Sequence, residues 1–144
     1  GLDHVVCTAG LLRLGLAVDL SPAELAEVIE VNVLGSLFTA RAAHPHLKAT
    51  GGSLTLFASS SFTLGRPRYV AYSASKAAIV NLAQGLAEEW AEDGIRVNAV
   101  APGPILTRWL AGREAHVEKY LEQAPLDPRV LVFRIENFKM IVVE

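Results

Sequence analysis

Tyr72 and Lys76 are the two residues of this chain whose types and spacing most directly suggest chemistry. Residues four apart on a helix share one face, about 6 Å apart at Cβ, so the lysine ammonium would lie beside the phenol. A free phenol has a pKa near 10, and only about one part in a thousand is ionised at pH 7, so a tyrosine acid or base needs help. An ammonium at about 4 Å and an effective dielectric of 20 contributes on the order of 4 kcal/mol. We therefore expect Lys76 to lower the pKa of Tyr72.

A hydroxyl-rich turn lies upstream of this pair, where a strand is predicted to end. The turn is Ser59-Ser60-Ser61, and Ser59 precedes Tyr72 by thirteen residues. Ligands in open α/β sheets bind outside the carboxyl ends of the strands, so this turn should lie near Thr8-Ala9-Gly10 and near residues 102–107. Ser59 is the candidate hydroxyl for catalysis, with Ser60 and Ser61 as alternatives.

Three β-rich runs alternate with two long helices in the part of the chain that holds these residues. Strands are predicted over 4–8, 53–58 and 95–101, and helices over 22–47 and 69–92. Strands separated by helices of this length indicate βαβ crossovers and a parallel sheet. The predicted fold class is α/β.

The first helix has a clear start and an unusually broad apolar surface. Ser21, Pro22 and Glu24 form a capping box with proline at the first helical position. Its apolar residues cover more than one stripe, so we expect burial on two sides. Pro45 and the glycines at 51 and 52 are predicted to end it, and Asp93-Gly94 to end the second helix. The second helix begins with an alanine-rich, largely uncharged half, which predicts packing against another helix.

Composition excludes several classes of function. The net charge is −2, with 51% hydrophobic and 19% charged residues, and neither sign of charge forms a run, so neither nucleic acid nor an anionic membrane is an expected partner. The lone cysteine, Cys7, has no metal-ligand set around it and is expected to be an inert buried thiol. The chain shows no membrane-spanning run and no signal peptide, so we expect a cytoplasmic protein.

Five pieces of the sequence, in this order, resemble the short-chain dehydrogenase/reductase family. They are Thr8-Ala9-Gly10, Asn32 within Val31-Asn32-Val33, Ser59, Tyr72-x-x-x-Lys76, and the run from Asn98 to Thr107, and they span residues 3 to 107. The resemblance implies a partial Rossmann-like, doubly wound parallel sheet with helices on both faces. It also implies that residues 1–144 form a single partial NAD(P)-binding domain.

The resemblance further implies a role for each matching residue. Tyr72 would protonate the substrate oxygen or act as base in reverse, Lys76 would lower its pKa and bind the nicotinamide ribose, and Ser59 would bind the substrate carbonyl. Asn32 would interrupt its helix and hold a water that links Lys76 to solvent, although it also fits an ordinary buried polar residue. The cofactor, NAD or NADP, would contact these residues: Ala9, Gly10, Tyr72, Lys76, Pro102, Gly103, Ile105 and Thr107.

The implied partners are a small carbonyl or alcohol substrate and further copies of the chain. In the family the counterparts of the two long helices pair across a two-fold axis, so we expect a homodimer or homotetramer. The lid segment would include Trp109 and Leu110, which fit either an apolar wall of the substrate site or packing on the protein's own core.

The sequence also departs from the family pattern. It contains no Gly-x-x-x-Gly-x-Gly turn, begins at the expected fourth strand, and has Cys7-Thr8 where the family has Asn-Asn. We therefore expect the 144-residue chain alone to be inactive. Three interpretations remain: a piece of an active reductase, a catalytically silent remnant that acts as an interaction or oligomerisation module, or the reductase half of a larger bifunctional enzyme.

Two further segments carry weaker patterns. Residues 108–123 predict an amphipathic helix, and 130–143 predict two β-rich runs around Glu136-Asn137, as in a hairpin, although 130–144 matches no part of the family pattern. A fainter resemblance links residues 56–66 and 76–84 to the reductase part of bifunctional enzymes that make nucleotide-activated ribitol. In that setting Arg66 or Arg68 would bind a substrate phosphate, or both are simply solvated loop arginines.

Overall fold

The computed structural model describes residues 1–63, 65–103, 133–136 and 139–142, and within them the strands form one five-stranded sheet. Its order is β1 (His4–Cys7), β2 (Ser53–Phe57), β3 (Arg96–Val100), β4 (Phe133–Glu136) and β5 (Lys139–Val142). The first three strands run parallel, with Cys7 opposite Leu56 and Phe57 opposite Val100. The α/β class is confirmed. The predicted hairpin is also confirmed, and it joins β3 in the antiparallel direction, which the purely parallel prediction did not include.

The first predicted helix is a continuous rod made of three parts. These are α1 (Pro22–Ile29), the π-helical turn η1 (Glu30–Leu34) and α2 (Gly35–Lys48). Ser21 caps α1, accepting from the Glu24 amide, while the Glu24 carboxylate accepts from the Ser21 amide at 2.9 Å. The predicted capping box is therefore confirmed.

Pro45 does not end this rod, so that part of the prediction is wrong. It lies inside α2, which continues to Lys48, and the chain turns only at Gly51, where φ is +61°. A proline near the end of a helix removes one backbone hydrogen bond. Leu47, the apolar residue two positions later, is fully buried, and its burial favours the extra turn.

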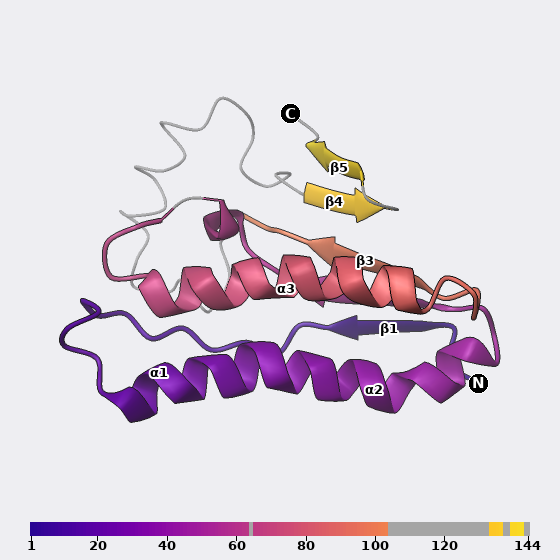
Figure 1. Cartoon of the computed structure of the whole chain (residues 1–144), viewed down its shortest axis with the longest axis horizontal. Coiled ribbons are helices and arrows are strands. Elements are labelled where there is room, and N and C mark those ends of the chain that lie inside the picture. Colours follow the sequence, from indigo (N-terminus) through magenta and orange to yellow (C-terminus); the bar gives the residue numbers. More distant parts are fainter. Residues whose placement is uncertain (64, 104–132, 137–138, 143–144) are drawn as a thin grey trace.

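The second long helix, α3 (Val70–Glu89), lies beside this rod (Figure 1). Both helical connections step along the sheet in the same direction, and right-handed crossovers of that kind place their helices on the same face. No helix among the described residues covers the second face, and the helix predicted over 108–123 lies outside them. Nor is any described helix long and apolar enough to cross a bilayer. The core between sheet and helices includes Leu47, Leu54, Leu56 and Ile79, all fully buried.

The first helix is buried on one side, not on two as its pattern predicted. Its buried stripe includes Val28, Ala40 and Leu47, whereas Leu34 and Phe38 of the second apolar stripe are 39% and 56% exposed. The cause is geometric, because β1, β2 and α3 all pack against the same side of the rod. The second stripe, completed by Ile29 and Val31, lies on the surface of the single chain.

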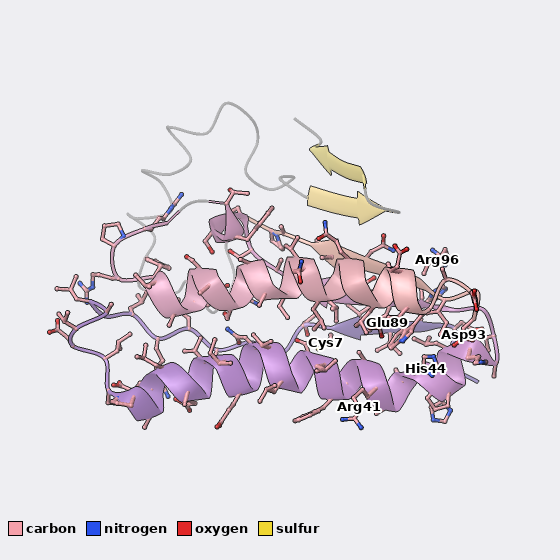
Figure 2. The ribbon with its side chains drawn as sticks, in the orientation of Figure 1. Cys7, Arg41, His44, Glu89, Asp93 and Arg96 are labelled. Atoms are coloured by element: carbon pink, nitrogen blue, oxygen red, sulfur yellow. The ribbon has the colours of Figure 1, made fainter. Side chains whose placement is uncertain are left out.

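Side-chain contacts among His44, Lys48 and Asp93 connect α2 to the turn between α3 and β3. Asp93 accepts from His44 Nε2 at 2.8 Å and from Lys48 Nζ at 2.6 Å. Figure 2 shows His44 and Asp93 at the same end of the molecule, and the His44 ring also lies 4.7 Å from that of Trp90. The hydrogen bond from Lys48, followed by that from His44, lowers the pKa of Asp93.

Removing this carboxylate should destabilise the fold in a pH-dependent way. A pKa lowered on folding stabilises the folded state above the unfolded value of about 3.9, and the contribution is lost as pH falls through the folded value. We expect Asp93→Asn to lower the thermal unfolding midpoint at pH 7, with the difference from wild type shrinking in acid. Glu89→Gln, at the same end of α3 and without an ion pair among the described residues, is the control. Equal midpoints for Asp93→Asn and wild type at pH 7 would contradict this role.

Candidate active site

Asn32 lies at the centre of the candidate site and is fully buried. Its Oδ1 accepts from the Leu11 amide at 2.7 Å, and its Nδ2 donates to the Leu11 carbonyl at 2.9 Å and to Ser75 Oγ at 2.9 Å. One side chain therefore joins the loop after β1, the first helical rod and α3. All the hydrogens of the amide are used in these contacts.

The helix widens around Asn32, as the resemblance implied. In η1 the Gly35 amide donates to the Glu30 carbonyl, five residues back instead of four. Such π-helical turns insert one residue into an α-helix and are frequent at functional sites. Here the turn aims a polar side chain at the neighbouring helix.

Lys76 extends from α3 to the carboxyl end of β2. Its Nζ donates to the Phe57 carbonyl at 2.7 Å, and the residue is only 4% exposed. Burial lowers the pKa of the ammonium, and the nearby Cys7 side chain acts in the opposite direction. Cys7 is buried, as expected. The fold places its side chain close enough to Lys76 to influence the pKa of the lysine.

The pKa of Tyr72 is raised, not lowered as its spacing from Lys76 predicted. Burial of the ring is the largest cause, a side-chain hydrogen bond with Ser59 opposes it, and Tyr69 adds to the increase. Lys76 Nζ lies 5.6 Å from the centre of the Tyr72 ring and donates to Phe57, so its charge does not outweigh the loss of water around the phenol. Tyr72 is thus held as a protonated acid at neutral pH.

Ser59 lies at the end of β2, where it caps the short 3-10 helix η2 (Ser60–Phe62). Its Oγ accepts from the Ser61 amide at 3.3 Å and from Ser61 Oγ at 2.9 Å. The Ser60 amide donates to the Pro102 carbonyl at 2.9 Å, which joins the turns after β2 and β3. Of the three candidate serines, Ser59 is the one that influences Tyr72.

Gly10 leaves space beside the polar atoms of the site. A Cβ at this position would lie 3.5 Å from both Asn32 Oδ1 and Lys76 Nζ. A longer side chain would fill the space next to the ammonium. The Lys76 ammonium has three hydrogens, and the structure gives one of them a partner, so a ribose with two hydroxyls fits here chemically.

The remaining predicted cofactor residues fall into two groups. Ala9 is exposed next to Gly10, and Pro102 and Gly103 are half-buried after β3. Ile105 and Thr107 lie outside the described residues, as do Trp109 and Leu110. Among the described residues, no group of three His, Cys, Asp or Glu side chains could hold a metal ion.

Ser75 is the site residue that sequence reasoning did not assign. It is fully buried, accepts from Asn32 and donates to the Tyr72 carbonyl at 2.7 Å. The available signal was a hydroxyl three residues after Tyr72 in an otherwise alanine-rich turn. Such a residue faces the same side of a helix as Tyr72 and favours a hydrogen bond to its carbonyl.

Comparisons with known proteins cover nearly the whole chain. Residues 1–137 match the family described as enoyl-(acyl carrier protein) reductase. That match includes residues 130–137, for which the sequence predicted no counterpart in the family.

Two curated relatives and one solved structure illustrate the similarity. The chain is 46% identical over 101 residues to a bifunctional ribulose 5-phosphate reductase/CDP-ribitol pyrophosphorylase of Haemophilus influenzae, covering 70% of the chain and 21% of that protein. It is 39% identical over 109 residues to a glucose 1-dehydrogenase of Gluconobacter oxydans, covering 74% and 41%. A gluconate 5-dehydrogenase from Burkholderia cenocepacia, solved with NADP and tartrate, superposes with a TM-score of 0.79 at 30% identity, covering 86% and 50%.

The chain spans between about a fifth and a half of the length of these relatives. The family match over residues 1–137 includes the segments that carry Asn32, Ser59, Tyr72 and Lys76. The chain belongs to the short-chain dehydrogenase/reductase family.

Proposed function

We propose that the intact protein is an NAD(P)-dependent oxidoreductase that interconverts a small carbonyl compound and its alcohol. Ser59, Tyr72, Lys76 and Asn32 would form its site. The observation that carries the proposal is the buried Tyr72, hydrogen-bonded to Ser59, with Lys76 Nζ 5.6 Å from the centre of its ring. The NADP bound by the Burkholderia cenocepacia enzyme supports the choice of cofactor.

Each side chain has a distinct chemical task in this proposal. Bound NAD(P)H would supply the hydride to the carbonyl carbon. The Tyr72 hydroxyl would donate its proton to the carbonyl oxygen, a task suited to a phenol whose pKa is raised by burial. Ser59 would donate a hydrogen bond to the same oxygen and stabilise the charge that develops there.

Lys76 would bind the nicotinamide ribose through the ammonium hydrogens that Phe57 does not accept, in the space that Gly10 leaves open. Its positive charge would also stabilise a Tyr72 phenolate when the reaction runs toward the carbonyl. Ala9, Pro102 and Gly103, with Ile105 and Thr107, are the proposed contacts to the rest of the nicotinamide end. Asn32 would hold the water that connects Lys76 to solvent.

Two alternatives to this proposal differ in the enzymatic activity that they predict for the intact protein. A silent remnant acting as an interaction module would show no nicotinamide-dependent turnover in the intact protein. The reductase half of a bifunctional enzyme is favoured by the 46% identity to the Haemophilus influenzae protein. In that case the substrate would be a pentulose phosphate.

The position of Arg68 bears on the second candidate function, reduction of a pentulose phosphate. It is exposed in the loop before α3, has a φ of +72°, and its carbonyl accepts from the Gly15 amide at 3.1 Å. The loops after β1 and β2 therefore lie together, and Arg68 and Arg66 stand just before the helix that carries Tyr72. A guanidinium there would bind a substrate phosphate through paired hydrogen bonds.

The exposed apolar stripe of the first helical rod supports the proposed homodimer or homotetramer. Ile29, Val31, Leu34 and Phe38 form this stripe, and Val70 of α3 is also 54% exposed. Several large apolar side chains exposed on one helical rod favour its use as a protein–protein interface.

Replacement of the phenol should separate this chemistry from folding. We expect Tyr72→Phe to reduce kcat in the intact protein by about 10²–10⁴-fold, the usual contribution of a general acid, with the unfolding midpoint unchanged. Tyr69→Phe is the matched control. The Tyr69 and Tyr72 ring centres lie 6.5 Å apart, and we expect this variant to alter kcat only slightly. The same comparison of Ser59→Ala with Ser60→Ala and Ser61→Ala decides between the three serines. Normal turnover by Tyr72→Phe would refute the assignment of the acid.

A substrate screen should identify the compound class. The intact wild-type protein is assayed with NADH and NADPH against pentulose phosphates, small ketones, steroids and acyl-thioester ketones. If a phosphorylated sugar is the substrate, Arg66→Ala or Arg68→Ala should raise its KM at least tenfold and leave the turnover of unphosphorylated ketones unchanged. Unchanged KM values for every phosphorylated compound would exclude the phosphate-binding role.

Light scattering tests the assembly. We expect the intact protein to be a dimer or tetramer at tens of micromolar, and Phe38→Glu to shift it toward the monomer because a charge would be buried in the interface. A monodisperse monomer for the wild type would rule out this use of the stripe.

A further inference from the structure

Ser75 occupies the junction between the three segments that form the candidate site. It is fully buried, so its hydroxyl has no access to water. Its oxygen accepts from Asn32 Nδ2 at 2.9 Å, and its hydrogen is donated to the Tyr72 carbonyl oxygen at 2.7 Å. Both functions of the hydroxyl, as acceptor and as donor, are therefore in use.

The acceptor of that second bond has a particular position in α3. In an α-helix the carbonyl of residue 72 receives the amide of residue 76, so it belongs to the turn that separates Tyr72 from Lys76. Ser75 adds a second donor to this oxygen. The turn that sets the spacing of phenol and ammonium is thereby tied to Asn32.

Asn32 passes this connection on to the loop after β1. The two hydrogen bonds between its amide and the Leu11 backbone, 2.7 Å and 2.9 Å long, fix the loop next to Gly10. The chain of contacts thus runs from Leu11 through Asn32 and Ser75 to the Tyr72 carbonyl. These hydrogen bonds connect the Gly10-Leu11 loop to α3, the helix that carries Lys76.

We propose that Ser75 is a positioning residue, which holds the first turn of α3 in register with the Gly10-Leu11 loop so that Tyr72 and Lys76 face the same space. This inference rests on the proposed function, because the register matters only where both side chains act on one bound substrate and cofactor. An alanine at position 75 would leave an amide hydrogen of Asn32 without its acceptor. The hydrogen-bonded connection from the loop through Asn32 to this helix turn would then be broken.

Ser73 provides a matched control two residues away. It is also buried on α3, but its hydroxyl has no hydrogen-bond partner among the described residues. Ser73→Ala and Ser75→Ala remove the same atoms from the same helix turn. Ser75→Ala removes a hydroxyl that makes two hydrogen bonds, whereas Ser73→Ala removes one that has no partner among the described residues.

The first measurement is hydrogen exchange in the intact protein without cofactor. We expect Ser75→Ala to increase exchange of the Leu11 amide about tenfold, because its acceptor on Asn32 loses an anchor. The Ser53 amide, bonded to the Asp3 carbonyl at 2.9 Å, is the reference for a general loss of stability, and the increase at Leu11 should exceed any change there. Ser73→Ala should change neither amide. Unchanged exchange at Leu11 in Ser75→Ala, or equal increases in both variants, would overturn the proposal.

The second measurement is steady-state kinetics. We expect Ser75→Ala to lower kcat about tenfold with KM for the carbonyl substrate within twofold of wild type, and Ser73→Ala to match wild type. Ser75→Thr keeps a hydroxyl at the position and should retain both Leu11 protection and turnover. Wild-type kcat in Ser75→Ala, or loss of turnover in Ser75→Thr at an unchanged unfolding midpoint, would overturn the positioning role. A wild-type protein without nicotinamide-dependent turnover would contradict the proposed function, whereas the exchange measurement still decides on the contacts of Ser75.

Discussion

The arrangement of the site depends on one buried amide, that of Asn32. A polar side chain with no exposure to water is stable only if its hydrogen bonds are made, and each unsatisfied group would cost roughly 1–3 kcal/mol. Asn32 makes three such bonds, to both backbone groups of Leu11 and to Ser75. These bonds require the loop after β1, the π-helical turn and α3 to occupy fixed relative positions. The position of Gly10 beside Lys76 follows from that constraint, since a Cβ at residue 10 would lie 3.5 Å from both Asn32 Oδ1 and Lys76 Nζ.

Burial also determines the protonation states of the site. Tyr72 and Lys76 lie between the helices and the carboxyl ends of the strands, where the loss of water raises the pKa of the phenol and lowers that of the ammonium. Both shifts favour the uncharged forms. The phenol is therefore an acid at neutral pH, and Lys76 Nζ donates a hydrogen bond to the Phe57 carbonyl. Proton donation to a carbonyl oxygen is the reaction that this pairing suits best.

Much of this structure could be predicted from local sequence patterns. The Ser21 capping box, the three parallel strands and the hairpin over 130–143 each depend on residues adjacent in sequence, and all were confirmed. Predictions that depend on the surroundings failed. The pKa of Tyr72 is set by burial, which a four-residue spacing does not reveal. Pro45 lies inside α2, and the burial of Leu47 favours the helical turn that follows it. Phe38 is exposed, because an apolar pattern predicts a contact surface but does not show whether this chain or a partner covers it. The spacing of Tyr72 and Lys76, together with the family resemblance for Asn32 and Ser59, indicated the candidate site residues, but not the hydroxyl of Ser75, which is bonded to Asn32 and to the Tyr72 carbonyl.

We propose that the nicotinamide cofactor binds next to Gly10, Asn32 and Lys76. Titration of the intact protein with NADPH, followed by nicotinamide fluorescence, tests it directly when wild type is compared with Gly10→Val. A Cβ at residue 10 would already lie 3.5 Å from Lys76 Nζ, so the valine methyl groups would occupy the space next to the ammonium. We expect saturable binding by the wild type and roughly a hundredfold weaker binding by the variant, with equal unfolding midpoints. Equal affinity of the two proteins for NADPH would contradict it.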